Sequence, residues 1–163
     1  MIIFLDTEFT SLNQPELISI GMISDDGKHQ LYLEVRDIVK DNCSEFVTTV
    51  VIPLLGHGKK VLKADLEAEL SAWFESLPEN ITIACDSDFD KDLLTKIFNG
   101  KLPSKVTHWI DLYTMKAHPD YQRTVLKYHA MAGREHHALH DAIAHRRGWL
   151  ACHDGKVLPK ERT

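Results

Sequence analysis

Acidic residues stand at three points of the sequence where their spacing could support metal-ion chemistry. Asp6 and Glu8 follow an apolar run and lie two positions apart, so on a β-strand both side chains would project from the same face. Asp90 follows a second apolar run, and Asp141 lies in a stretch rich in histidine and alanine. Carboxylates are the preferred ligands of hard cations such as Mg²⁺. Together these residues could hold a metal ion.

Each acidic group also has an ordinary structural interpretation. Pairs such as Asp6 and Glu8 occur on solvated strands, although the apolar residues 2–5 before them favour a buried strand that ends where α/β proteins bind ligands. The polar residues 86–90 could cap a helix. Asp141 is expected among apolar neighbours on a helix, and a buried carboxylate is costly unless a cation compensates its charge. A metal ion would meet that need.

The histidines around Asp141 offer a second kind of metal chemistry. His136 and His140 are four residues apart, and His137 and His145 are close to them in the sequence. A zinc site is one interpretation, but no cysteine or glutamate completes a standard zinc spacing.

These residues must be positioned by strands and helices, which hydrophobic periodicity and turn residues predict. Asp26-Gly27 is a strong tight-turn signal and indicates an antiparallel hairpin. The predicted elements are, in order, strands 2–6, 16–24 and 28–35, a helix followed by a loop over 36–60, a helix 64–76, a strand 81–85, a helix 89–97, a strand 106–112, and helices 124–131 and 138–152.

Three antiparallel strands followed by alternating strands and helices predict an α/β fold with a mixed five-stranded sheet flanked by helices. The 163 residues, 44% of them apolar, suit one domain over 1–155, with a polar tail over 156–163. No window approaches the roughly 18 consecutive apolar residues of a membrane span. The three cysteines are widely spaced, which favours a reducing compartment. We therefore expect a cytoplasmic protein without membrane contact.

The formal net charge of −5 argues against a polyanionic partner only if the acids are spread over the surface. Gathering four carboxylates in one metal site would leave the rest of the chain nearly neutral. Bound divalent cations would then turn that pocket into an anion acceptor. The acidic balance is compatible with a nucleic-acid substrate.

Three short motifs in this order are similar to those of one known family. They are Asp6-Thr7-Glu8, Phe89-Asp90 leading into a leucine-rich helix, and His136-x-Ala138-x-x-Asp141-Ala142. The sequence resembles the DEDDh exonucleases, the DnaQ-like branch of the RNase H-like fold. The resemblance covers nearly the whole chain, and residues 4–9 and 17–21 are especially similar to small stand-alone bacterial exoribonucleases related to RNase T and oligoribonuclease. Asp86 departs from the pattern, because an asparagine that is not a metal ligand is common there.

The resemblance implies a two-metal exonuclease that shortens nucleic acid from its 3′ end and releases nucleoside 5′-monophosphates. Two Mg²⁺ ions, with Mn²⁺ as a substitute, would be bridged by Asp6. Glu8 and Asp141 would bind one of these ions, and Asp90 would hold the other largely through water. The resemblance assigns His136 as the general base that takes a proton from the attacking water. His137 is a rival for that role, but the register of the motif favours His136.

The substrate implied by the resemblance is the 3′ end of single-stranded RNA or DNA, with RNA favoured, and a homodimer is expected. Phe9 and Thr10 could contact the terminal base and sugar, although Phe9 would serve equally well in the core. Nearby basic residues could touch phosphates, namely Arg123, Lys127, Arg134, Arg146 and Arg147. The alternatives are a catalytically inactive nucleic-acid-binding module, a zinc hydrolase and a protein-interaction domain.

Overall fold

A mixed β-sheet forms the centre of the computed structural model, which describes residues 1–78 and 80–153. Within these residues the sheet has six strands in the order β4-β3-β2-β1-β5-β6. β1, β2 and β3 are antiparallel neighbours, whereas β4, β5 and β6 run parallel to the strands they join. The strands are β1 (Ile2–Phe9), β2 (Leu17–Ser24), β3 (Gln30–Val35), β4 (Lys59–Val61), β5 (Ile81–Cys85) and β6 (Val106–Asp111).

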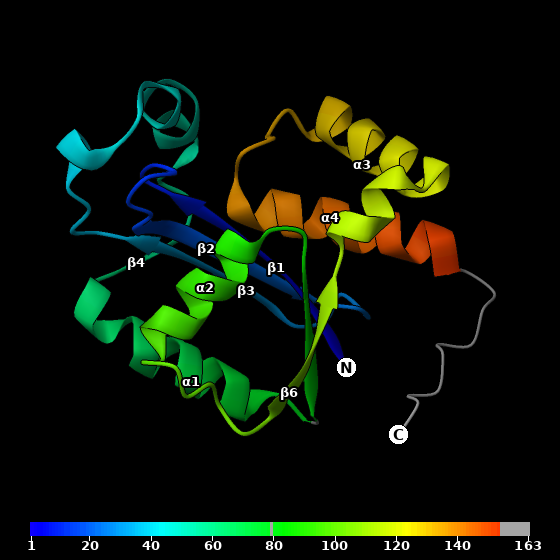
Figure 1. Cartoon of the computed structure of the whole chain (residues 1–163), viewed down its shortest axis with the longest axis horizontal. Coiled ribbons are helices and arrows are strands. Elements are labelled where there is room, and N and C mark those ends of the chain that lie inside the picture. The colour runs from blue at the N-terminus through cyan, green and yellow to red at the C-terminus, as the bar shows by residue number, and fades with distance from the viewer. Residues whose placement is uncertain (79, 154–163) are drawn as a thin grey trace.

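Helices cover both faces of the sheet (Figure 1). α1 and α2 lie on one side, and α4 lies on the other side with α3 packed against its outer surface. The helices are α1 (Leu66–Ser76), α2 (Asp88–Ile97), α3 (Pro119–Ala132) and α4 (Ala138–His153). Short 3₁₀ and π segments are Lys40–Asn42, Val47–Val51, Ile52–Leu54, Lys63–Asp65 and Tyr113–Ala117.

The sheet separates two apolar clusters, and strand β1 contributes to both because its side chains alternate between the two faces. Ile2 and Phe4 belong to a buried cluster that includes residues of α4, whereas Ile3 belongs to the larger core on the side of α1 and α2. Asp6 and Glu8 continue the row of Ile2 and Phe4. The fold therefore directs both acids toward the side of the sheet on which α4 lies.

Gly21 of β2 allows α4 to approach the sheet unusually closely. It is paired directly with Asp6 of β1. A methyl group at Gly21 would overlap the backbone of Ala138 and Leu139 at the start of α4. The absent side chain thus sets the distance between the acidic strand β1 and the first turn of α4, which carries Asp141.

The predicted α/β class, the antiparallel strands at the start of the chain and the flanking helices are confirmed. The predicted number of strands was wrong, because β4 adds a sixth to the five expected. The helix followed by a loop that was predicted within 36–60 is present as a short helical stretch over 45–54, whose last turns are π and 3₁₀ turns, followed by the loop 55–58. Pro53 and the glycines after it prevent a longer regular helix. α3 is longer than predicted and begins at Pro119, where proline suits the first helical turn.

Among the described residues, no helix is both long and apolar enough to cross a membrane. The predicted tail, 156–163, and the predicted domain boundary at residue 155 lie outside the residues that the structure describes.

Candidate metal site

An open pocket of about 680 Å³ lies where β1 and β5 end. Acidic side chains and one histidine lie on one side of it, and apolar side chains form much of the rest. The structure brings all five residues predicted as catalytic to this pocket. They are Asp6, Glu8, Asp90, His136 and Asp141.

The two acids of β1 lie in this pocket without the partners that normally stabilise a carboxylate. Neither Asp6 nor Glu8 accepts a hydrogen bond from any residue that the structure describes. Burial, reinforced by the neighbouring carboxylates Asp90 and Asp141, raises the pKa of Asp6 well above its ordinary value. Burial and the charge of Asp90 raise the pKa of Glu8 to about 8. A nearby cation would favour the charged form of both groups.

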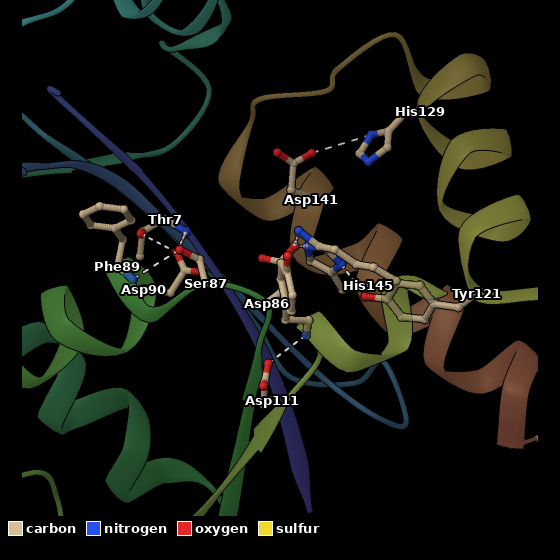
Figure 2. Close-up of polar contacts among 12 residues, drawn as sticks. Thr7, Asp86, Ser87, Phe89, Asp90, Asp111, Tyr121, His129, Asp141 and His145 are labelled. Carbon is tan, nitrogen blue, oxygen red and sulfur yellow. Dashed lines mark hydrogen bonds and ion pairs between the residues drawn. The ribbon is translucent and has the colours of Figure 1, made fainter. Parts of the chain in front are cut away.

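Asp90 is fixed to β1 from the first turn of α2 (Figure 2). Ser87 caps this helix by accepting a hydrogen bond from the backbone of Phe89 at 3.2 Å. Oδ1 of Asp90 accepts hydrogen bonds from the backbone N–H and the hydroxyl of Thr7, at 2.9 and 2.6 Å. Its Oδ2 is buried without a hydrogen-bond partner, and burial raises its pKa to about 7. One oxygen therefore positions the side chain and leaves the other for a ligand.

Asp141 and His136 are linked at the start of α4. The backbone N–H of His136 donates to Oδ2 of Asp141 at 3.0 Å, and His136 has a positive φ of 68°. Oδ1 of Asp141 is buried without a hydrogen bond and lies 3.6 Å from Nδ1 of His129 (Figure 2). Burial, followed by the charge of Glu8, raises the pKa of Asp141 to about 8. This carboxylate, too, lacks a full compensating charge.

Two groups of side chains have the spacing of metal ligands. In the first, one ligand atom each from Glu8, His136 and Asp141 lies within 4.8 Å of the others. In the second, Asp6, Asp86 and His145 meet the same limit. Two ligand atoms on one ion can lie at most about 4.2 Å apart when the bonds are about 2.1 Å long. Small side-chain movements would therefore suffice for binding at either position.

The second group was not predicted from the sequence, which considered His145 only as part of a possible zinc site and placed no ligand role on Asp86. Nε2 of His145 lies 3.4 Å from Oδ2 of Asp86, and Nδ1 lies 2.7 Å from the hydroxyl of Tyr121 (Figure 2). Lys116 also contacts Oδ2 of Asp86, at 2.7 Å. Burial lowers the pKa of His145, so its imidazole is neutral near pH 7. His145 lies one helical turn after Asp141, and this i, i+4 spacing was the available sequence signal.

The other histidines do not form a zinc site in the part of the chain that the structure describes. His136 belongs to the first ligand group and His145 to the second. His137 is only 4% exposed and stacks on the ring of Tyr32, with ring centroids 4.3 Å apart. His140 packs edge-on against His137. Of the two rivals for the proton-acceptor role, His136 lines the pocket and His137 does not.

Of the two residues predicted to contact the substrate, one lines the pocket and the other does not. Phe9 lines the pocket and packs on Phe89, with ring centroids 5.0 Å apart. Thr10 is fully buried, and its hydroxyl donates to the carbonyl of Gln14 at 3.0 Å and accepts from the backbone of Glu16 at 3.1 Å. The prediction for Phe9 is compatible with its position. Thr10 instead stabilises the loop after β1 and is not placed to contact a substrate.

Two of the basic residues proposed for phosphate contact have structural partners. Nε of Arg146 donates to the backbone carbonyls of Ser24 and Asp25, at 3.0 and 2.9 Å, and so ties α4 to the end of β2. The guanidinium of Arg147 lies 4.7 Å from the ring centre of Tyr128. Sequence proximity to Asp141 was therefore a poor guide to which basic side chains face the pocket.

The chemistry of this pocket suits divalent cations. Its carboxylates are crowded, two of their oxygens are buried without hydrogen bonds, and the ordinary compensation by arginine is absent among the described residues that line it. Buried carboxylates in this state carry a large free-energy cost unless they are protonated or bind a cation. Oxygen-rich donors favour Mg²⁺ or Mn²⁺.

No model of a known protein family matches the chain, and no curated protein is significantly similar to it.

Proposed function

We propose that this chain is a metal-dependent 3′-to-5′ exonuclease of the DEDDh type with an RNase H-like fold. It hydrolyses phosphodiester bonds at the 3′ end of single-stranded nucleic acid, with RNA preferred to DNA, and releases nucleoside 5′-monophosphates. The observation that carries the proposal is the convergence of Asp6, Glu8, Asp90, His136 and Asp141 on one pocket. These residues come from β1, α2 and the start of α4, in agreement with the three motifs of the resemblance.

Two Mg²⁺ ions, or Mn²⁺ in their place, fit the acidic side of the pocket. When bound, they would stabilise negative charge on the phosphate and on the leaving 3′ oxygen. In the arrangement that the resemblance implies, Asp6 would be shared by the two ions, Glu8 and Asp141 would hold one of them, and Asp90 would hold the other through water. The hydrogen bonds from Thr7 fix Asp90 and leave its Oδ2 available for this task.

His136 takes the proton from the attacking water in this proposal. Its backbone N–H is bonded to Asp141, and its ring packs edge-on against Phe46, with ring centroids 4.9 Å apart. These two contacts hold the imidazole at the edge of the acidic cluster without occupying it. An imidazole placed in this way can act as a general base.

Apolar side chains opposite the acids provide a surface for the terminal nucleotide. Phe9, Leu12 and Phe46 line the same pocket as the carboxylates, and Leu12 is 71% exposed. Bases stack on aromatic and apolar surfaces without strong sequence preference. A 3′-terminal base resting there would place its phosphate toward the metal ligands. The resemblance further favours a cytoplasmic homodimer.

The proposal is tested by incubating the purified protein with 5′-labelled single-stranded RNA, or DNA of the same sequence, in Mg²⁺, Mn²⁺ or a chelator. We expect stepwise shortening from the 3′ end that is faster on RNA and is abolished by the chelator. Asp6→Asn and His136→Ala should abolish it too, whereas His57→Ala, which changes an exposed histidine, should not. RNA that is bound but not shortened would instead support an inactive nucleic-acid-binding module.

A further inference from the structure

Asp86 lies beside the predicted metal ligands, at a position where the resemblance implied an uncharged residue. It follows β5 directly and, with Asp6, lines both the large pocket and a second, adjoining pocket of about 360 Å³. The charge of Asp86 contributes to the raised pKa of Asp6, so the two carboxylates are close enough to repel. Two such acids stay together if one of them is protonated or if a positive charge lies near them, and Lys116 supplies one such charge at Asp86.

His145 supplies a nitrogen donor to the same place. It is 7% exposed, and its Nε2 is directed at Asp86 while Nδ1 contacts the hydroxyl of Tyr121 (Figure 2). A metal-binding histidine commonly has its second ring nitrogen fixed by a hydrogen-bonding partner of this kind. Tyr121 thus has the geometry of a residue that orients a ligand.

We propose that Asp86 and His145 are additional metal ligands that complete, with Asp6, a second cation position suited to Mn²⁺. The inference deepens the proposed metal-dependent function and rests on it. Asp6 would link this position, which is the one that Asp90 holds through water in the proposed function, to the position of Glu8 and Asp141, with His136 beside it as the general base. Two carboxylate oxygens and one imidazole nitrogen form a donor set that favours a transition-metal ion over Mg²⁺, which prefers oxygen ligands.

The contact between Lys116 and Asp86 offers a way to distinguish a metal site from a purely structural ion pair. Its ammonium group contacts Oδ2 of Asp86 at 2.7 Å, and its side chain is 50% exposed. The same oxygen faces His145, so Lys116 and a cation would compete for it. Lys116 can leave toward solvent when a metal binds. Removing its charge should therefore strengthen metal binding, whereas a structural ion pair predicts no such gain.

The test is a Mn²⁺ titration of the full chain without nucleic acid, followed by electron paramagnetic resonance of free Mn²⁺. Two ions should bind to the wild-type protein. Asp86→Asn and His145→Asn should each weaken one of them at least about tenfold, and Tyr121→Phe should weaken it about tenfold. Lys116→Met should bind that ion more tightly. Asp92→Asn and His57→Asn, which change exposed residues, serve as matched controls.

A nitrogen signal from the bound Mn²⁺ provides a second measurement. It should persist in His136→Ala and disappear in His145→Asn. The inference is overturned if both ions bind to Asp86→Asn and His145→Asn with unchanged affinity, or if Lys116→Met does not strengthen binding. Because no nucleic acid is present, these results are separate from the nuclease assay. Shortening of RNA by a protein whose Asp86→Asn variant keeps both ions would refute this inference alone.

Discussion

Replacing Gly21 by alanine should move Asp141 away from Asp6 and Glu8 without changing any of these three proposed metal ligands. Gly21 is paired with Asp6, and an added methyl group would overlap the backbone of Ala138 and Leu139. Backbone atoms cannot rotate away as the end of a flexible side chain can. The start of α4, and Asp141 with it, must therefore move outward from the sheet.

The size of this movement follows from ordinary atomic contacts. Carbon atoms pack best at about 3.5 Å, and restoring that distance at Gly21 requires a shift of roughly 1 Å. A shift of about 1 Å in a catalytic group can lower activity by about 100-fold. Overpacking of this kind typically costs about 1–3 kcal/mol of stability. Gly21→Ala should thus fold at 25 °C, melt at a lower temperature, and bind Mn²⁺ at least about tenfold more weakly.

Leu70→Ala is the matched control, because Leu70 is fully buried in α1 on the opposite side of the sheet. This change should cost about 2–5 kcal/mol of stability and leave Mn²⁺ affinity unchanged below the melting temperature. Thermal melts and Mn²⁺ titrations of both variants provide the comparison. Unchanged affinity in Gly21→Ala, or an equal loss in Leu70→Ala, would refute the link between helix approach and metal binding.

Three further predictions follow from the site. In the metal-free protein the pKa of Glu8 is about 8, against about 4.3 in an unfolded chain, so the stability of the fold should fall as pH rises through this range. Glu8→Gln should show a shallower fall of stability with pH and a higher melting temperature at pH 8 than the wild-type protein. A steeper fall in Glu8→Gln would contradict this. His136→Ala should lower the RNA hydrolysis rate about 10²- to 10⁴-fold with Mn²⁺ binding retained, whereas His137→Asn should mainly lower the melting temperature. Phe46→Ala should raise KM for a short RNA about fivefold or more through lost stacking, and an unchanged KM would exclude Phe46 from the substrate surface. Met131→Ala, which changes a side chain of α3 that is 76% exposed, is the control.

The sequence was most informative where one local rule determined the structure. The spacing of Asp6 and Glu8 placed them on one face of a strand, since strand side chains alternate strictly. The polar residues before α2 were expected to cap it, and Ser87 does so. The third motif contains both His136 and Asp141, and these two residues are in contact at the start of one helix.

The features that sequence reasoning missed depend on contacts between distant segments. β4 has only three residues, Lys59–Val61, and two of them are lysines, so no apolar alternation marks it. Asp86 was interpreted as a helix cap because its neighbours suit that role. Its contacts with Lys116 and His145 arise only when the segment after β6 and the middle of α4 pack beside the end of β5. Contacts between such distant segments cannot be predicted from the residue spacing within any one of them.

One face of the sheet carries most of the apolar core and the other carries the acidic pocket. This separation explains how the fold tolerates the crowded carboxylates. The largest buried cluster lies on the side of α1 and α2, where Leu70 and Phe74 pack against the sheet. The cluster on the side of α4 is smaller and contains Ala142, whose short side chain permits close packing. Repulsion among the carboxylates therefore destabilises the face that contributes less apolar burial. The proposed cations would offset this repulsion when they bind. Variants that bind metal more weakly should therefore also show weaker packing of α4 against the sheet.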